Sequence, residues 1–315
     1  MLVKTSSMGD VIHNLPVVSD IRSHFPEAEI DWVVEESFAG IPALHPGVNT
    51  ILSVAVRRWR KNPLSPAVRA EIRAAYRQLR SKAYDVVLDT QGLVKSAVIA
   101  RLARGTRCGY DWHSAREPLA ALFYDETVRV EKTLHAVERN RLLGGRAFGY
   151  VPDDPVNYGV AAPSSNLSWL PAGPCAVLLH ATSRDDKLWP EPGWIALGEH
   201  LAGKGVACIL PWGSAAEQQR SQRLAAQIPN AIVAPALSLG QAASLLSRAV
   251  AAVGVDTGLI HLAAALGVPA VALYCASEPG LTGVYTRSKA INLGGAGTPP
   301  DPARVISALE GLAPL

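Results

Sequence analysis

The sequence predicts an α/β protein made of two Rossmann-like domains with mostly parallel sheets. Short apolar strands alternate with amphipathic helical stretches along the 315 residues. This alternation starts twice, near residue 1 and near residue 176, on either side of a stretch with weak regular signals, 149–173. The length also fits, because a chain of this size usually forms about two domains. We expect domains over 1–155 and 156–315.

The first half is predicted to open with a very short strand at residues 1–4 and a glycine-containing loop that leads into a helix. Asp10 lies at or near the N-cap of that helix, where a capping role is a common reason for an aspartate. Segments 107–112 and 115–124 continue this half. The other expected strands are 28–36 and 84–92, the latter ending in a turn, and the expected helices are 11–25, 65–82, 93–103 and 135–148.

The second half repeats the pattern. The last helix, 301–312, is expected to pack on either half. The expected strands are 176–180, 206–211, 231–233 and 250–255, and the expected helices are 192–204, 215–227 and 238–248.

Residues 253–277, VGVDTGLIHLAAALGVPAVALYCAS, are the most informative stretch of this half. They predict a buried strand, a tight turn at 256–258, a helix over 259–266 and a second strand after Gly267. The start of a helix offers unpaired N–H groups, and Gly258 lets a ligand approach the backbone, so a phosphate fits there. An ordinary strand-to-helix turn explains this stretch equally well.

Composition describes a compact globular protein, with 49% apolar and 18% charged residues. Residues 257–277 carry no charge, but His261 and the Gly267–Pro269 break divide them into segments too short to cross a bilayer. No positively charged segment followed by an apolar core opens the sequence, so we expect no signal peptide and a cytoplasmic protein. The four cysteines are scattered, which argues against a zinc site and a disulfide framework.

Residues 57–82 hold nine basic residues and one acid, a local charge of +8 in a chain whose net charge is +3. On a helix, Arg69, Arg73, Arg77 and Arg80 form one face, while Val68, Ile72 and Leu79 form another that can face a core. The pattern indicates a surface that binds anions. A solvated helix face is the alternative, and nucleic acid is a weaker one because few aromatic residues accompany the charge.

Several motifs, in one order along nearly the whole chain, resemble those of bacterial lipopolysaccharide heptosyltransferases, and of heptosyltransferase I more than heptosyltransferase II. The resemblance implies the GT-B fold, with two Rossmann-like domains facing across a cleft. Members usually carry a few more apolar residues before Lys4, so the first strand is expected to look clipped. The motifs are KTSSMGDVIHNLP (4–16), DWVVEE (31–36), RRWRK (57–61), DTQGLVKSA (89–97), HATSRDDKLWP (180–190), LPWGSAAE (210–217) and VDTGLIHLAAAL (255–266).

The resemblance implies an inverting transfer of heptose from ADP-L-glycero-β-D-manno-heptose to a Kdo sugar of Kdo2-lipid A. It makes the first domain acceptor-binding and the second donor-binding, with the enzyme peripheral on the cytoplasmic face of the inner membrane. It implies Asp10 and Lys187 as catalytic residues and Arg57, Arg58, Arg60 and Lys61 as acceptor-binding residues. The implied donor-binding residues are Thr182, Ser183, Lys187, Glu217, Leu237, Asp256, Thr257, Gly258 and His261.

The same residues make chemical sense by themselves. Glycosyl transfer needs a base for the acceptor proton and positive charge or N–H dipoles for the departing diphosphate. Asp10 and Lys187 supply these two groups, although a lone lysine is by default solvent-exposed. Glu217 follows a strand and can bind ribose hydroxyls, or simply favour the first turn of its helix. Without a D-x-D pair or a His/Cys cluster, we expect no metal and no cofactor besides the donor co-substrate.

Two other kinds of protein share some of these features. A nucleotide-sugar epimerase or hydrolase shares the phosphate-binding turn but has no use for a polybasic acceptor surface. A non-catalytic nucleotide-sugar sensor keeps Lys187 and Thr257 but needs no base at Asp10. The presence of both features favours the transferase.

Overall fold

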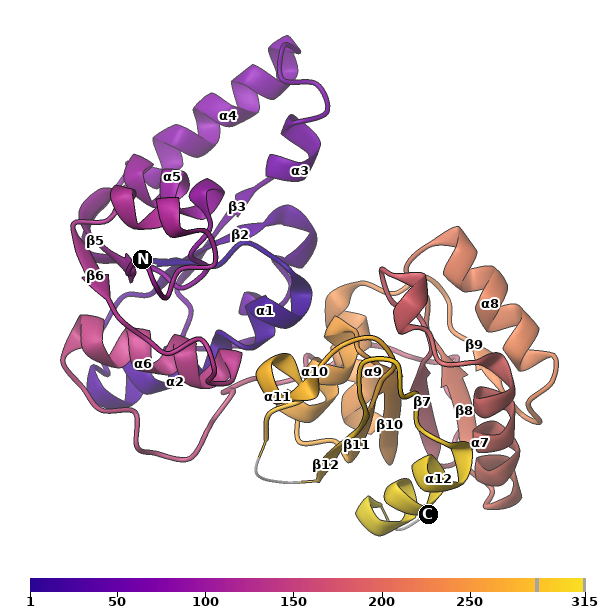
Figure 1. The fold of residues 1–315 in the computed structure, drawn as a ribbon. Coiled ribbons are helices and arrows are strands. Elements are labelled where there is room, and N and C mark those ends of the chain that lie inside the picture. Colours follow the sequence, from indigo (N-terminus) through magenta and orange to yellow (C-terminus); the bar gives the residue numbers. More distant parts are fainter. Residues whose placement is uncertain (287–288, 314–315) are drawn as a thin grey trace. The chain divides into compact units, whose positions relative to one another are not determined.

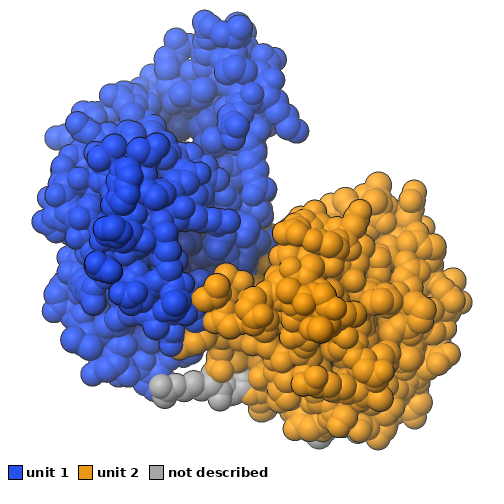
Figure 2. Space-filling view, viewed as in Figure 1, with its two compact units in different colours: residues 1–159 blue, residues 160–315 orange. Residues whose placement is uncertain are grey.

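The computed structural model describes residues 1–286 and 289–313. These residues form two compact units, Met1–Gly159 and Val160–Leu315 (Figure 2). The division lies slightly later than the expected boundary at 155, because the segment up to Gly159 stays with the first unit. Each unit is a parallel sheet covered by helices, as the alternation of strands and helices predicts (Figure 1).

In its described residues, unit 1 contains a six-stranded parallel sheet in the order β3-β2-β1-β4-β5-β6. The central strand β1 pairs with β2 on one side and with β4 on the other. The strand order therefore reverses between β1 and β4, which is where ligands bind in sheets of this kind. The strands are β1 (Leu2–Val3), β2 (Asp31–Glu35), β3 (Thr50–Val54), β4 (Ala83–Asp89), β5 (Arg104–Tyr110) and β6 (Glu126–Val128).

Two helical layers cover the sheet of unit 1 (Figure 1). Helices α2 and α6 pack against each other. A separate buried cluster joins Leu79 of α4 and Ile99 of α5 to Val33 and Val87 of the sheet, so apolar burial holds these two helices in place. The helices are α1 (Met8–Ile12), α2 (Leu15–His24), α3 (Val56–Trp59), α4 (Pro66–Leu79), α5 (Val94–Leu102) and α6 (Ala136–Phe148).

Two local predictions for unit 1 were wrong, and one strand was not predicted. The expected helix 11–25 is two helices, because Pro16 has no N–H group and its ring obstructs a helix that continues from Ile12. The short strand β3 was not predicted, since its TILSV sequence mixes polar and apolar residues at the sheet edge. Ile72 was expected to face the core but is 39% exposed, whereas Val68 and Leu79 are buried.

In its described residues, unit 2 repeats the arrangement, with a parallel sheet in the order β12-β11-β10-β7-β8-β9. Strands β7, β10 and β11 are buried along their whole length, as their continuous apolar sequences predict. The strand order reverses between β7 and β10. The strands are β7 (Cys175–Leu179), β8 (Ala207–Leu210), β9 (Ile232–Val233), β10 (Ala251–Val255), β11 (Ala270–Tyr274) and β12 (Ala290–Gly294).

The last helix, α12, packs on α7, β11 and β12 of unit 2, with Val305 and Leu309 in the core of that unit. This helix therefore belongs to the second compact unit. The helices of unit 2 are α7 (Glu191–Gly203), α8 (Ala215–Ala225), α9 (Leu239–Arg248), α10 (Gly258–Ala265), α11 (Pro279–Thr282) and α12 (Pro302–Leu312).

The four cysteines are buried and carry free thiols, as the scattered spacing predicts. Among the residues described, no helix has both the length and the apolar character needed to span a membrane.

Candidate active site

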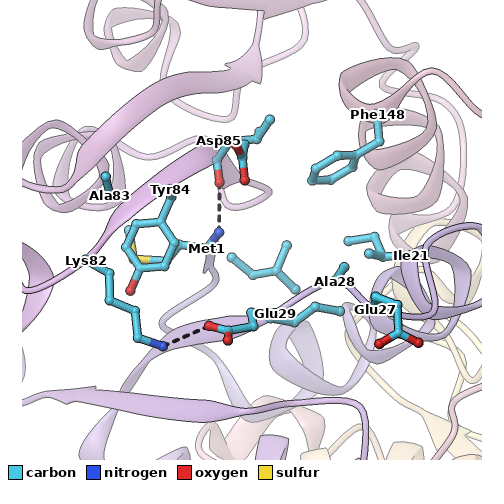
Figure 3. Close-up of a pocket in the computed structure, with 13 residues that line it drawn as sticks. Met1, Ile21, Glu27, Ala28, Glu29, Lys82, Ala83, Tyr84, Asp85 and Phe148 are labelled. Atoms are coloured by element: carbon cyan, nitrogen blue, oxygen red, sulfur yellow. Dashed lines mark hydrogen bonds and ion pairs between the residues drawn. The ribbon is translucent and has the colours of Figure 1, made fainter.

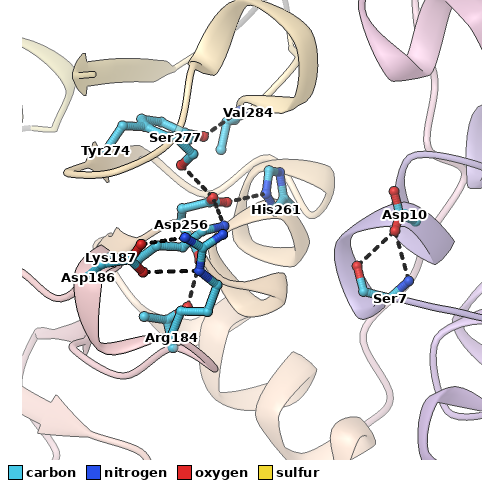
Figure 4. A network of polar contacts seen from close by, with 11 residues as sticks. Ser7, Asp10, Arg184, Asp186, Lys187, Asp256, His261, Tyr274, Ser277 and Val284 are labelled. Atoms are coloured by element: carbon cyan, nitrogen blue, oxygen red, sulfur yellow. Dashed lines mark hydrogen bonds and ion pairs between the residues drawn. The ribbon is translucent and has the colours of Figure 1, made fainter. Parts of the chain in front are cut away.

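In unit 1, Asp10 lies in α1, on the segment that follows the carboxyl end of β1. It is the third residue of that helix, near the N-cap as expected, and Ser7 occupies the N-cap position itself. The Oδ2 atom of Asp10 accepts hydrogen bonds from the backbone N–H and the hydroxyl of Ser7, both at 2.8 Å (Figure 4). Within the described residues Oδ1 has no hydrogen-bond partner, so one carboxylate oxygen is held in place and the other is available.

The basic motif follows β3. Arg57 and Arg58 belong to α3, Arg60 caps its end, and all of these side chains and that of Lys61 are exposed. Arg58 forms ion pairs with Glu36 at 3.0 Å and Glu71 at 2.9 Å. Its charge is therefore largely neutralised by the protein. Arg57 lies over the ring of Phe38, 5.2 Å from its centre, and Arg60 and Lys61 form no ion pair in the described part of the chain.

Two further cations, Lys95 and Arg116, are exposed in this unit and were missed in the sequence. Lys95, at the start of α5, donates a hydrogen bond from Nζ to the hydroxyl of Ser6 at 3.0 Å. Burial, and next the charge of Arg57, lower the pKa of Lys95, and Arg116 acts in the same direction. Lys95 lies within the DTQGLVKSA motif and follows strand β4, which is the signal that could have identified it.

In unit 2, the sequence-predicted donor residues follow the carboxyl ends of adjacent strands. Thr182 follows β7 and Asp256 follows β10, on the two sides of the point where the strand order reverses. The hydroxyl of Thr182 donates to the backbone oxygen of Asp256 at 3.0 Å and so joins the two loops. Ser183 is exposed in the same segment as Thr182. The carboxyl ends of strands at a reversal of strand order are where ligands bind in sheets of this kind.

Asp256 is the centre of a polar network (Figure 4). Its Oδ2 atom accepts from Lys187 Nζ at 2.6 Å and from the Ser277 hydroxyl at 2.7 Å, and its Oδ1 atom lies 3.7 Å from His261 Nε2. Burial alone raises the pKa of this carboxyl, but the hydrogen bonds from its three side-chain partners hold it well below the usual range. The Asp256 side chain therefore binds these three groups and does not cap α10.

The same network changes the interpretation of Lys187 and His261. The side chain of Lys187 is 20% exposed and paired, so it is not the solvent-facing lysine that was the default. It is placed by a short 3-10 helix, Asp185–Lys187. His261 is 5% exposed and comes from the first turn of α10. Both side chains are held in fixed positions by one carboxylate.

The start of α10 fits a phosphate group. Thr257 is its N-cap residue, but its side chain makes no capping hydrogen bond, and Gly258 is the first helical residue. N–H groups of the first turn are therefore left for a ligand, and the helix dipole favours an anion there. This end of the helix directly follows Asp256, so Lys187 lies beside it.

Glu217 and Leu237 lie near the carboxyl ends of the neighbouring strands β8 and β9. Glu217 is in the first turn of α8, and its Oε2 atom accepts from the N–H of Gly213 at 2.7 Å. The loop carrying Glu217 is fixed by Trp212, whose indole N–H donates to the oxygen of Ala234 at 2.7 Å. Leu237 is half-buried three residues beyond that contact.

These residues form no metal centre, and a cavity of unit 1 lies apart from them. In the described residues, no group of three or more His, Cys, Asp or Glu side chains is arranged to hold a metal ion. The cavity, of about 380 Å³, lies near Met1, Tyr84 and Phe148, with the Lys82–Glu29 ion pair at its edge (Figure 3). It adjoins the amino ends of β1 and β4, away from the ends that carry Asp10.

A family match, related sequences and solved structures all relate this chain to glycosyltransferases. Residues 72–308 match glycosyltransferase family 9 (heptosyltransferase). The chain is 46% identical over 295 residues to lipopolysaccharide heptosyltransferase 1 of Escherichia coli O18:K1:H7, covering 92% of this chain and 90% of that one. It is 47% identical over 296 residues to lipopolysaccharide heptosyltransferase 1 of Pseudomonas aeruginosa, covering 93% and 83%.

Solved structures agree with the sequence comparisons. E. coli heptosyltransferase WaaC with ADP matches with a TM-score of 0.92 and 43% identity, over 99% of each chain. E. coli ADP-heptose lps heptosyltransferase II matches with a TM-score of 0.79 but only 22% identity, over 99% and 97%. These matches and the two parallel sheets confirm the expected GT-B fold class. The chain belongs to glycosyltransferase family 9, the heptosyltransferases.

Proposed function

We propose that this glycosyltransferase performs the heptosyltransferase I reaction, moving L-glycero-D-manno-heptose from ADP-heptose to the Kdo of Kdo2-lipid A. The carrying observation is 46% to 47% identity to heptosyltransferase 1 proteins over more than nine-tenths of the chain. The site supports the same chemistry. Unit 1 offers a carboxylate with one available oxygen, and unit 2 offers a held cation beside a helix N-terminus.

In this proposal Asp10 is the general base. Its Oδ1 atom takes the proton of the acceptor hydroxyl while the hydroxyl oxygen forms a bond to the anomeric carbon of heptose. The bond between that carbon and the ADP oxygen breaks, and ADP leaves with the electron pair. Attack on the side opposite to the leaving group inverts the anomeric centre. Ser7 holds Oδ2, so the carboxylate has a defined orientation for this step.

Unit 2 is proposed to bind the donor. Lys187 and the first N–H groups of α10 stabilise the negative charge that develops on the departing diphosphate. Thr182, Ser183, Thr257, Gly258 and His261 surround the phosphates and the sugar, with Asp256 fixing their arrangement. Glu217 binds the ribose and Leu237 contacts the nucleoside. Because these groups already supply positive charge and N–H dipoles, the reaction is proposed to need no metal.

Unit 1 is proposed to bind the acceptor. Kdo carries a carboxylate and the lipid A sugars carry phosphates, so the acceptor offers several anions. Three exposed cations lie at the carboxyl end of β3: Arg57, Arg60 and Lys61. Arg58 lies there too, but its charge is partly neutralised by its ion pair with Glu36. Lys95, whose Nζ donates to the hydroxyl of Ser6 in the loop that leads to Asp10, and the exposed Arg116 are further cations of this unit. Arginine suits this task because its planar group binds carboxylates and phosphates with two hydrogen bonds.

The lipid acceptor places the enzyme on the cytoplasmic face of the inner membrane in this proposal. On α4, Arg69, Arg73 and Arg77 are exposed, and Ile72 and Tyr76 beside them are 39% and 43% exposed. Leu64, just before the helix, is 74% exposed. A helix with basic residues next to exposed apolar and aromatic ones is typical of binding at an anionic membrane surface. Nucleic acid is not proposed as a partner.

The test is an acceptor comparison. Purified enzyme with ADP-heptose, assayed with and without EDTA, should transfer heptose to Kdo2-lipid A and give an inverted linkage detectable by mass and by NMR. Heptosyl-Kdo2-lipid A, the acceptor expected of heptosyltransferase II, should react at least tenfold more slowly. A preference for that second acceptor would overturn the assignment. Loss of activity with EDTA and its return with magnesium would overturn the metal-free proposal alone.

An epimerase, a hydrolase and a non-catalytic sensor each have less support. The match to a UDP-N-acetylglucosamine 2-epimerase structure from Listeria monocytogenes has 14% identity and a TM-score of 0.59, which shows the shared fold alone. A hydrolase has no use for the exposed cations of an acceptor surface, and a non-catalytic sensor does not explain the orientation of Asp10.

A further inference from the structure

We propose that Gln91 is a positioning residue that fixes the loop carrying Asp10. The inference rests on the proposed role of Asp10 as base. Gln91 is 7% exposed and follows β4, on the other side of the strand-order reversal from the loop that follows β1. Its side chain therefore reaches across the point where the two loops separate.

The side chain of Gln91 makes three hydrogen bonds to the base loop. Its Oε1 atom accepts from the backbone N–H and from the hydroxyl of Thr5, both at 2.7 Å. Its Nε2 atom donates to the backbone oxygen of Ser6 at 3.0 Å. The side-chain amide of Gln91 therefore uses both its oxygen and its nitrogen in hydrogen bonds to the consecutive residues Thr5 and Ser6.

These bonds continue the sheet where its backbone pairing stops. Between β1 and β4 the last backbone bond runs from the N–H of Thr90 to the oxygen of Val3 at 3.3 Å. On the other side of the loop, the N–H of Glu35 donates to the oxygen of Thr5 at 3.1 Å. Thr5 is consequently held from both neighbouring strands, by the main chain on one side and by Gln91 on the other.

The position of Asp10 depends on this loop. Ser7 follows the segment that Gln91 holds, and both bonds to Asp10 Oδ2 come from Ser7. Lys95 adds a bond from Nζ to the hydroxyl of Ser6 at 3.0 Å. The direction of the available Oδ1 atom is therefore set by the loop backbone, although Gln91 itself does not touch Asp10.

The backbone of Gln91 is in turn held by the turn that follows β4. The buried carboxylate of Asp89 accepts from the N–H of Gln91 at 2.8 Å and of Gly92 at 3.3 Å, which closes a tight turn. Gly92 has φ of +65°, a conformation that favours glycine. The hydroxyl of Tyr124 donates to the other oxygen of Asp89 at 2.8 Å. Both polar atoms of the Gln91 side chain and both carboxylate oxygens of Asp89 thus have hydrogen-bond partners. Such full hydrogen bonding is expected of side chains that hold a functional group in one orientation.

The expected effect is on turnover and not on binding. A shift of about 1 Å in a reacting group costs on the order of 100-fold in rate. We expect Gln91→Leu, which keeps the side-chain size but removes all three bonds, to lower kcat between tenfold and 100-fold. The ADP affinity and the acceptor KM should change less than threefold, because neither set of binding residues is altered. Thr5→Val removes one of the three bonds and should give a smaller loss of kcat.

The matched control is Asn49→Ala. Asn49 is another amide of unit 1 that joins two segments, accepting from the N–H of Ile30 at 2.8 Å and from Arg22 at 2.7 Å. It should lower the melting temperature without lowering kcat. The deciding measurement adds Gln91→Leu to Asp10→Asn, where it should cause no further loss if Gln91 acts through Asp10.

Three outcomes would overturn the inference. The first is a folded Gln91→Leu protein, or a Thr5→Val protein if Gln91→Leu does not fold, with unchanged kcat. The second is a loss of kcat from Gln91→Leu that is equally large in the Asp10→Asn background, because Gln91 would then act on another group. The third is near-normal turnover by Asp10→Asn alone, which identifies a failure of the proposed base and not of the loop geometry.

Discussion

At the scale of single residues, Lys187 and Asp256 show how a charged side chain gains a defined role from its surroundings. In the sequence Lys187 is ambiguous because a lone lysine is by default solvent-exposed, and Asp256 is ambiguous because it directly precedes a helix, where an aspartate often acts as a cap. In the structure they are joined at 2.6 Å, and Ser277 and His261 approach the same carboxylate. Removing one partner leaves the other charge in a partly buried position without its counter-ion, which is costly.

Lys187→Met should therefore weaken donor binding and lower kcat. The lost charge-assisted interaction with diphosphate, at about 1.5–3 kcal/mol, corresponds to a roughly tenfold to 100-fold rise in the Kd for ADP-heptose, measured by calorimetry. Lys204→Met is the control, because Lys204 belongs to the same unit and pairs with Glu310 on the surface at 3.4 Å. Equal donor affinities in the two variants would remove Lys187 from the donor site.

The basic motif separates into residues with different expected effects. Arg58 already binds Glu36 and Glu71, whereas Arg57 has an exposed guanidinium over Phe38. Arg57→Ala should raise the acceptor KM about tenfold, the loss of one charge-assisted hydrogen bond, and Arg58→Ala should raise it less. ADP affinity should not change in either. A larger acceptor effect from Arg58 than from Arg57 would contradict the assignment.

At the scale of elements, two buried histidines make stability depend on pH. Burial lowers the pKa of His45 and of His180 to about 4, and each ring is neutral in hydrogen bonds with a serine. The unfolded chain takes up these protons below a pKa of about 6.5, so it binds more protons than the folded chain. Stability should therefore fall as the pH drops from about 6.5 towards 4, by at most roughly 3 kcal/mol per residue.

Urea unfolding between pH 7 and pH 5 measures this effect. His45→Asn and His180→Asn should each flatten the dependence of the unfolding free energy on pH, whatever their effect on stability at pH 7. His113→Asn, at an exposed position, should leave the slope unchanged. Slopes that are the same in all four proteins would show that neither buried ring is responsible.

Helix α4 supports a separate prediction about membranes. Each basic residue near an anionic bilayer contributes about 1 kcal/mol at low salt, so Arg69, Arg73 and Arg77 together correspond to roughly 100-fold in partitioning. Their replacement by Gln should lower binding to phosphatidylglycerol-containing vesicles by about that factor, measured by sedimentation. The same change at Arg223, Arg248 and Arg304 of unit 2 is the charge-matched control. Similar losses in both triple variants would indicate a general charge effect and not a membrane-binding helix.

The elements also show what the sequence could and could not predict. The long periodic helices and the buried strands of unit 2 were predicted closely, since β7, β10 and β11 are apolar throughout. The break between α1 and α2 follows from Pro16 and could have been predicted. The bond network of Asp256 could not be predicted, because its bonds join residues up to 74 positions apart. Such contacts depend on strand order, which periodicity does not specify.

At the scale of the whole molecule, the two units have the same strand order and carry complementary chemistry at the carboxyl ends of their strands. Unit 1 presents a carboxylate and cations, and unit 2 presents a cation held beside a helix N-terminus. The proposed donor and acceptor roles of the units rest on this difference, since a base and an anion-binding surface suit the acceptor. The family assignment and the geometry of each unit therefore support one account.

Asp10→Asn tests the central claim of that account. Asparagine keeps nearly the same volume and can still accept from Ser7, but its amide cannot take a proton, so transfer to Kdo2-lipid A should fall at least 100-fold. ADP-heptose affinity, measured by calorimetry on the same preparation, should remain within about twofold of the original value. Near-normal transfer by this variant would contradict the proposed base, and with it the mechanism.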